Sequence, residues 1–166
     1  MNERAFDLAQ LNIALLRAPL DSEQLADFVA ALDPINTAAD ASPGFVWRLV
    51  GKGGDATSIR AFGDDRFIVN MSTWASIEAL RSFTFSTAHA EVMRNRRKWF
   101  HSMAEAYVAL WWVPKGHRPT VREAEEHLAH LRVHGPSPVA FTFKVPFPEP
   151  NAGSEPRNPS LTAETG

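Results

Sequence analysis

The sequence predicts an α+β protein in which helices pack on one face of an antiparallel β-sheet. Segments of strand composition and segments of helical periodicity alternate along the chain in the order β-α-β-(β)-β-α-α-β-α-β, and no segment repeats another. The first strand, Leu8–Leu16, alternates apolar and polar residues in the way that half-buried strands do. Together these two observations favour a single sheet with one polar-tolerant face.

The first half of the chain contains a strand, a helix and a second strand. Residues of Leu8–Leu16 divide between two faces, with Leu11, Ile13 and Leu15 on one and Gln10, Asn12 and Ala14 on the other. A helical stripe follows Pro19 at Leu25, Phe28, Val29 and Leu32. Pro34 is expected to break or kink this helix. The next strand, Phe45–Val50, places Phe45, Trp47 and Leu49 on one face.

The second half begins with an expected hairpin of Thr57–Phe62 and Arg66–Met71, with Asn70 near the middle of the sheet. Ser72 or Thr73 can cap a short helix, and Ser86 or Thr87 can cap a longer one. Thr120 and Glu123 have the spacing of a capping box, which predicts a helix that ends at Gly135–Pro136. Ala140–Phe143 can add a last short strand.

The strand predicted at Ala106–Val113 is apolar at nearly every position, which indicates that both of its faces are covered. Helices on one side of a small sheet cover only one face. We therefore expect a partner subunit on the other face, and the sequence predicts a homodimer.

Composition limits the classes of function. The 166 residues include no cysteine, so disulfides, thiolate nucleophiles and cysteine-based zinc sites are excluded. A formal net charge of −2 gives no general attraction to nucleic acid or to a membrane surface. The longest apolar run is too short to cross a bilayer, and no signal peptide is recognisable, so we expect a cytoplasmic protein. Residues 1–143 are expected to form the domain, and residues 144–166 a Pro-rich, disordered tail.

His89 is the best-placed reactive side chain. It shares a helical face with Val92, Met93, Arg96 and Trp99, so it should point inward. It also lies in the first turn, where the helix dipole disfavours the imidazolium and favours a neutral ring. Such a ring can accept a proton, accept a hydrogen bond or bind a metal; an inward histidine can equally be a core residue that donates to a carbonyl.

Other polar and aromatic residues complete the candidate site. Arg96 on the inward stripe either reaches the edge of the core or pairs with a carboxylate or an anionic substrate group. Histidines at helical spacing, His127, His130 and His134, share a face with Glu123, but this face lies beside the buried stripe, where a metal would be poorly held. The expected pocket is built from Asn12, Trp47, Asn70, Trp74, Phe85, His89 and Trp112.

Two sets of motifs carry a family resemblance. Ser72–Ser76 followed by Thr87–His89 resembles the dimeric α+β-barrel superfamily of antibiotic-biosynthesis monooxygenases. More closely, the chain resembles a bacterial family of domains of unknown function in that superfamily, at Gly44–Arg48, Leu110–Pro114 with Gly116–Pro119, and Gly135–Pro136 with Ala140–Phe141. The resemblance implies a ferredoxin-like monomer that dimerises sheet to sheet.

Haem-degrading members of the superfamily suggest one cofactor. In those enzymes a histidine binds the haem iron, and an asparagine in the first strand helps to control bound oxygen. His89 and Asn12 stand at comparable positions in this chain. Those enzymes differ from it in a tryptophan about ten residues before the histidine, where this chain has Ala79. The resemblance therefore leaves haem on His89 and no cofactor as the two alternatives.

Three functions follow from these observations. The first is a monooxygenase-like oxidoreductase that acts on a small apolar or aromatic molecule, with His89 as general base or iron ligand and Asn12 polarising a carbonyl or bound oxygen. The second is a cofactor-free isomerase, cyclase or dehydratase in which His89 moves a proton and Arg96 steadies an anion. The third is a non-catalytic ligand-binding dimer.

Overall fold

The computed structural model describes residues 4–51 and 62–150 of the chain. Within these residues five strands form one antiparallel sheet: β1 (Phe6–Leu16), β2 (Phe45–Arg48), β3 (Phe67–Trp74), β4 (Phe100–His101) and β5 (Val108–Pro114). The long strand β1 lies at the centre, with β3 along one side and β5 and β4 along the other. β2 pairs with β3 at the outside of the sheet. The predicted α+β class with an antiparallel, ferredoxin-like sheet is confirmed.

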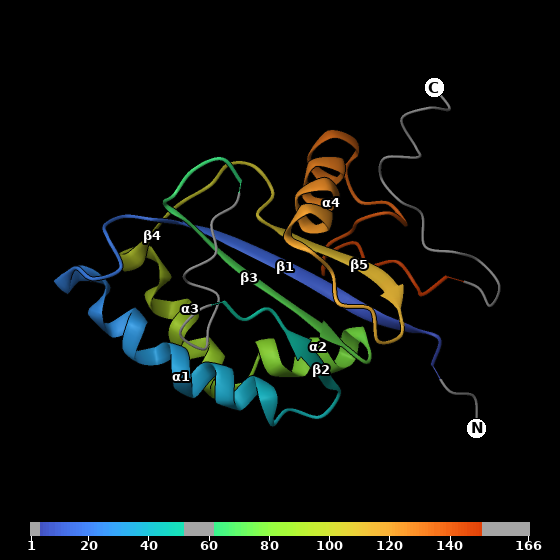
Figure 1. Cartoon of the computed structure of the whole chain (residues 1–166), viewed down its shortest axis with the longest axis horizontal. Coiled ribbons are helices and arrows are strands. Elements are labelled where there is room, and N and C mark those ends of the chain that lie inside the picture. Colours follow the sequence, from blue (N-terminus) through green and yellow to red (C-terminus); the bar gives the residue numbers. More distant parts are fainter. Residues whose placement is uncertain (1–3, 52–61, 151–166) are drawn as a thin grey trace.

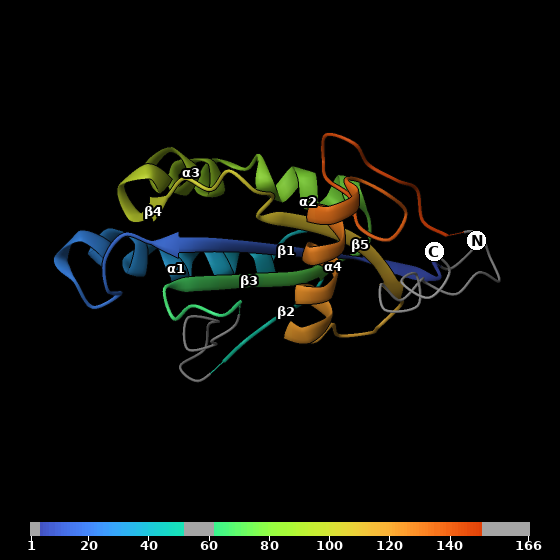
Figure 2. The same cartoon turned by 90° about the horizontal axis from the view of Figure 1, so that it is seen from above.

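Four α-helices of the described chain pack on this sheet: α1 (Ala26–Asp40), which follows a 3-10 turn at Glu23–Leu25, α2 (Ile77–Thr84), α3 (Thr87–Trp99) and α4 (Val121–His134). Figure 1 shows α1, α2 and α3 on one side of the strands and α4 on the other. In the view from above, α1 lies behind the strands and α4 in front of them (Figure 2). None of the described helices is long and apolar enough to cross a membrane.

The helix α4 supplies the second cover that the sequence assigned to a partner subunit. On its side of the sheet, Trp111 of β5 and Leu11 of β1 pack with Leu128 and Leu131 of α4. On the opposite side, Leu110 packs with residues of α2 and the end of β3. Both faces of β5 are therefore covered within one chain. The covered strand no longer argues for a dimer, and the homodimer stays a prediction.

Pro34 does not divide α1. The helix runs without interruption from Ala26 to Asp40, with Pro34 inside it. A proline removes one backbone donor and disturbs one turn, but the apolar residues Phe28 and Ala39 are buried on either side of it. Tertiary packing of both halves outweighs this local cost, so the expected break is wrong.

The short helix α2 begins later than the sequence suggested. Ser72 and Thr73, the predicted caps, belong to β3, which extends to Trp74. The N-cap is Ser76, whose hydroxyl accepts a hydrogen bond from the Ala79 N–H at 3.1 Å. The chain offers two serines before this helix, and pairing of β3 with β1 as far as Trp74 selects the later one.

A β-bulge in β2 changes the face of one tryptophan. The register shifts between Phe45, which lies opposite Trp74, and Trp47, which lies opposite Thr73. Neighbouring residues of β3 point to opposite faces of the sheet, so their partners do too. Phe45 packs on the α2 side, whereas Trp47 packs on the α4 side. The prediction that these two residues share a face is wrong.

The predicted α4 helix is confirmed at both ends. The Thr120 hydroxyl accepts a hydrogen bond from the Glu123 N–H at 3.1 Å, as the capping spacing indicated. At the other end Gly135 has a φ of 73°, a conformation that favours glycine, and its N–H donates to the Leu131 carbonyl. Local chemistry alone was sufficient to set these bounds.

The ends of the predicted domain are only partly described. The expected strand Thr57–Phe62 falls almost wholly outside the described residues. Phe141 forms an isolated bridge with Leu110 on β5 in place of a full strand. Farther on, the Trp112 indole N–H donates to the Phe147 carbonyl at 3.0 Å, so the chain still packs on the sheet three residues past Lys144. Residues 151–166 of the expected tail lie outside the described part.

Candidate functional site

A cavity of about 470 Å³ lies between the sheet and the three helices on its α1 side. The sheet contributes side chains from β1 and β3, namely Gln10, Asn12, Asn70, Ser72 and Trp74. The helices contribute Phe28, Leu32 and Ile35 from α1, Leu80 and Phe83 from α2, and His89, Val92 and Arg96 from α3. The wall is therefore mostly apolar, and one group of its polar side chains lies on the two central strands.

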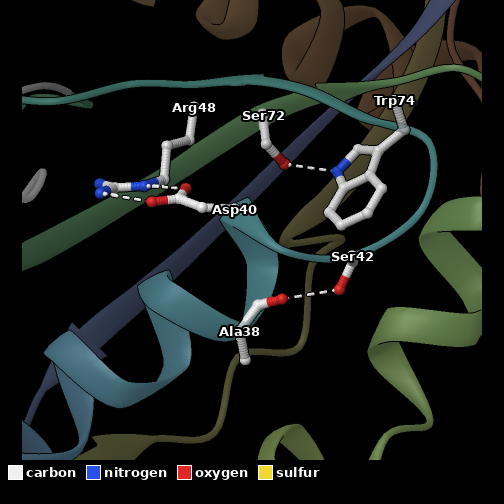
Figure 3. A network of polar contacts seen from close by, with 6 residues as sticks. All are labelled: Ala38, Asp40, Ser42, Arg48, Ser72 and Trp74. Atoms are coloured by element: carbon white, nitrogen blue, oxygen red, sulfur yellow. Dashed lines mark hydrogen bonds and ion pairs between the residues drawn. The ribbon is translucent and has the colours of Figure 1, made fainter.

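A hydrogen-bonded strip crosses the floor of this cavity. Gln10 and Ser72 are direct partners in the β1–β3 pairing, and Asn12 and Asn70 are the next pair along the same face. The Gln10 amide nitrogen donates to Asn70 Oδ1 at 2.7 Å and to Ser72 Oγ at 3.0 Å. The Trp74 indole N–H donates to the same Ser72 oxygen at 2.8 Å (Figure 3).

These contacts leave polar groups available to a ligand. Ser72 Oγ accepts two hydrogen bonds, so its own proton can be donated elsewhere. Asn70 uses its oxygen as an acceptor, and its NH₂ group makes no hydrogen bond within the described residues. The Asn12 side chain makes none within this part of the chain either. The strip can therefore donate several hydrogen bonds into an apolar space.

Sequence reasoning missed Gln10 and Ser72 as site residues. The alternation of β1 already placed Gln10 on the face of Asn12, so that signal was present. Ser72 was misassigned as a helix cap, which hid its place on the strand. Only the register between β1 and β3 brings the two side chains together.

His89 lies in the first turn of α3 and lines the cavity, on the stripe that its spacing indicated. Burial lowers the pKa of the imidazole, and a hydrogen bond with the Thr84 backbone acts in the opposite direction. The ring is consequently neutral at pH 7. Its Nδ1 atom is buried and has no hydrogen-bond partner.

The Nδ1 atom of His89 is not placed to bind haem iron in this conformation. Iron must approach a ring nitrogen to about 2.1 Å along its lone pair. Nδ1 is enclosed by protein atoms, and the hydrogen bond with the Thr84 backbone engages the ring on the α2 side. In this conformation Nδ1 therefore does not face an iron in the cavity.

An aromatic row connects His89 to the sheet. The His89 ring meets the edge of Phe83 at a centroid distance of 5.3 Å, and Phe83 stacks on Trp74 at 5.3 Å. Phe45 contacts the other side of Trp74 at 5.4 Å, with the ring planes at 82°. This row fixes one end of the cavity as a rigid aromatic wall, suited to a flat apolar molecule.

Arg96 lines the cavity wall two helical turns beyond His89. Its Nη1 donates to the Tyr107 hydroxyl at 3.1 Å, and its guanidinium lies over the Tyr107 ring at 4.8 Å from the centroid. The alternative of a buried carboxylate partner is not realised within the described residues. Arg48 also lines the cavity, but it forms an ion pair with Asp40 at 2.8 Å (Figure 3).

Five of the predicted site residues come together around the cavity, and three do not. The five are Asn12, Asn70, Trp74, His89 and Arg96. The expected placement of the other three needs correction. Trp47 lies on the α4 side because of the bulge, and Phe85, at the C-cap of α2, is 77% exposed. Trp112 packs beside Phe141, away from the cavity.

The α4 histidines also differ from their prediction. His127 is buried, and its Nδ1 hydrogen-bonds with the Glu123 carbonyl at 2.7 Å. Its ring stacks on Trp111. The face that the sequence placed beside the buried stripe is thus partly in the core. A histidine used in this way is a packing residue.

The fold and the cavity together define an α+β protein with a space for a small molecule between its sheet and its helices. By sequence, the chain belongs to the family described as Domain of unknown function (DUF3291), whose match spans residues 7–157. No curated protein matches the chain significantly.

Solved structures of similar fold include SnoaB, a cofactor-independent oxygenase from Streptomyces nogalater. It is 18% identical, with a TM-score of 0.47, and the match covers 72% of this chain and 100% of SnoaB. Another is PA3566 from Pseudomonas aeruginosa, 10% identical with a TM-score of 0.48, where the match covers 70% of this chain and 100% of the other.

Proposed function

We propose that this chain is an enzyme that binds a small, largely apolar or aromatic molecule in the cavity and oxidises it with molecular oxygen. The observation that carries the proposal is the strip of Gln10, Asn70 and Ser72 on the floor of a largely apolar space. Apolar walls bind a ring system, and a few fixed polar groups orient its oxygen atoms. The choice of oxidation follows the resemblance to the monooxygenase superfamily.

His89 and Asn12 have the main roles in this proposal. His89 is the one side chain of the described cavity wall whose ordinary pKa lies near neutrality, and burial keeps its ring uncharged. It serves as the base that removes a proton from the substrate, after a turn of the ring brings Nδ1 toward the cavity. The amide of Asn12 polarises a substrate carbonyl or hydroxyl.

The reaction needs no added reductant when the substrate supplies the electrons. A CH₂ group made acidic by neighbouring oxygens loses a proton to His89 and leaves an electron-rich carbanion. Molecular oxygen then converts the CH₂ group to a carbonyl, and its second oxygen atom leaves as water. The overall balance is R₂CH₂ + O₂ → R₂C=O + H₂O.

A second function uses the same groups without oxygen. His89 moves a proton and Arg96 stabilises the resulting anion, which is the chemistry of an isomerase, cyclase or dehydratase. The observation in its favour is that Arg96 lies on the same helix face as His89 and lines the same cavity. A non-catalytic binding dimer is the third alternative.

Oxygen consumption tests the proposal. The probe is 1,3-dihydroxynaphthalene, whose oxidation by O₂ to 2-hydroxy-1,4-naphthoquinone and water is balanced without a cofactor. We expect the native protein to consume oxygen with this probe, and His89→Ala to lose most of the rate while its circular dichroism is unchanged. His134→Ala, exposed at the end of α4 beyond the opposite face of the sheet, is the matched control.

The results test the role of His89 and separate the oxygen-dependent function from the two alternatives. Equal oxygen consumption by the native protein and His89→Ala would remove His89 from the reaction. Binding of the probe without oxygen consumption, measured by fluorescence, would favour the oxygen-independent or the non-catalytic alternative. The homodimer is tested separately, by the mass of the native protein in multi-angle light scattering.

A further inference from the structure

Among the described residues, Arg96 is a cation without a partner of opposite charge. Within the described residues its side chain makes one hydrogen bond, to the Tyr107 hydroxyl, and one contact with the face of the Tyr107 ring. A guanidinium has five N–H donors, so four of them have no protein acceptor there. The residue is only partly exposed and faces the cavity.

The other charges at the cavity differ from this one. Arg48 pairs with Asp40, so its charge is compensated within the protein. Lys144 is exposed at the rim, where water can solvate its ammonium group. In the described part of the wall there is no aspartate or glutamate. In the described part of the wall, Arg96 is therefore the cation that is both partly withdrawn from water and free of a carboxylate partner.

A guanidinium in such a place is costly unless an anion joins it. Loss of hydration penalises a charge, and an ion pair or several hydrogen bonds must offset the penalty. Tyr107 offsets part of it and also holds the guanidinium plane in place. A fixed planar fork with open N–H groups matches the two oxygens of a carboxylate.

The position of Arg96 relates it to the polar strip. Its partner Tyr107 accepts a backbone hydrogen bond from the Ile13 N–H at 3.0 Å, next to Asn12 on β1. Asn12 pairs with Asn70, which bonds with Gln10. Asn12 and Arg96 both line the cavity, and Trp74 lies at the other end of the strip. A ligand with its anion at Arg96 can therefore extend its ring system along the strip toward Trp74.

From these contacts we infer that the natural ligand is an apolar or aromatic carboxylic acid whose carboxylate binds Arg96. This inference rests on the proposed function in one respect, that a small molecule occupies the cavity, and it is independent of the reaction. It makes Arg96 a specificity-determining residue that selects acids over their uncharged analogues.

A pair of probes of nearly equal shape tests the charge directly. The two are 2-naphthoate and the uncharged 2-naphthamide, each measured by displacement of the fluorescent probe N-phenyl-1-naphthylamine. We expect the native protein to bind the acid about 10- to 100-fold more tightly than the amide, as expected for a charge-assisted pair. The preference should fall as NaCl is added.

Variants assign the preference to one side chain. Arg96→Gln should abolish the preference and leave the affinity for 2-naphthamide within about twofold, whereas Arg96→Lys should retain part of it. The matched control is Arg97→Gln, an exposed neighbour on α3 that does not line the cavity and carries the same change of charge. Near-ultraviolet circular dichroism confirms that each variant is folded.

The outcomes separate this inference from the proposed function. Equal binding of acid and amide by the native protein would overturn the inference and leave the small-molecule site intact. A preference that survives in Arg96→Gln, or that disappears in Arg97→Gln, would also overturn it. If no probe, charged or uncharged, binds the native protein, the proposed site fails and the inference fails with it.

Discussion

The imidazole of His127 stacks on the indole of Trp111, with ring centroids 4.5 Å apart and planes 13° apart. This contact joins α4 to the centre of β5, on the face of the sheet opposite the cavity. The His127 ring also bonds with the Glu123 carbonyl one turn earlier. Both rings are buried, so the histidine must stay neutral for α4 to remain packed against the sheet.

Stability should fall in acid because of this histidine. Burial lowers the pKa of His127, against opposing effects of the Glu123 carbonyl and of Glu123 and Glu126, while His130 lowers it further. The folded chain therefore binds a proton less readily than the unfolded chain, whose histidines titrate near 6.5. The stabilisation is complete above about pH 6.5 and is lost as the pH falls below it.

The variant His127→Phe keeps a ring on Trp111 and removes the titrating group. Its free energy of unfolding, measured by urea titration between about pH 5 and 8, should depend less steeply on pH than that of the native chain. Removal of one titrating group can change this slope by at most about 1.4 kcal/mol per pH unit. Identical slopes for the native chain and the variant would contradict the role given to His127. His89 and His130, whose pKa values burial also lowers, contribute to the slope that remains.

Ser72 supports the floor of the cavity. Replacing it with alanine removes the acceptor for the Trp74 indole and one of two acceptors for Gln10. An unsatisfied buried donor costs about 1–3 kcal/mol, so Ser72→Ala should lower the free energy of unfolding by that amount. Ser102→Ala, at an exposed serine, should change it by less than about 0.5 kcal/mol. A neutral Ser72→Ala would mean that another group satisfies both donors.

Gly44 lies where the chain passes from α1 to β2, close against α2. Its φ is 82°, and a Cβ added there would lie 2.5 Å from the Ala79 Cβ. Gly63 has a similar φ of 76° with no neighbouring atom in the way. Gly63→Ala therefore measures the backbone cost alone, about 1–2 kcal/mol, and Gly44→Ala adds overpacking of about 1–3 kcal/mol. Equal losses of stability in the two variants would show that α2 shifts to accommodate the added methyl group with no loss of stability.

The N-cap of α4 offers a test of local chemistry. Thr120→Ala removes the acceptor for the Glu123 N–H and should lower the free energy of unfolding by about 1 kcal/mol. Thr120→Ser keeps the hydroxyl and should be close to neutral. Thermal denaturation of the three proteins at one pH gives the comparison. A loss of equal size in the serine variant would point to the methyl group instead of the cap.

The candidate site could be predicted in part because some of its signals are local. The helical spacing placed His89 and Arg96 on one inward face, and the alternation of β1 placed Asn12 on the face opposite Leu11. The predicted face of Trp47 is wrong because a bulge in β2 moves the residues after it to the opposite face of the sheet. No local sequence pattern indicates this bulge. Phe85 was predicted in the pocket, but it lies at the C-cap of α2, where its side chain is exposed.

The sequence by itself determined the order of the elements, the capped helix α4 and the inward stripe of α3, because periodicity and capping depend on residues within a few turns of one another. The tertiary structure decided the rest. Pairing of Asn12 with Asn70, the meeting of Gln10 with Ser72, and the contact of Arg96 with Tyr107 depend on strand register and helix docking. Those are set by long-range packing, which also brought α4 to the face of the sheet where a partner subunit was expected.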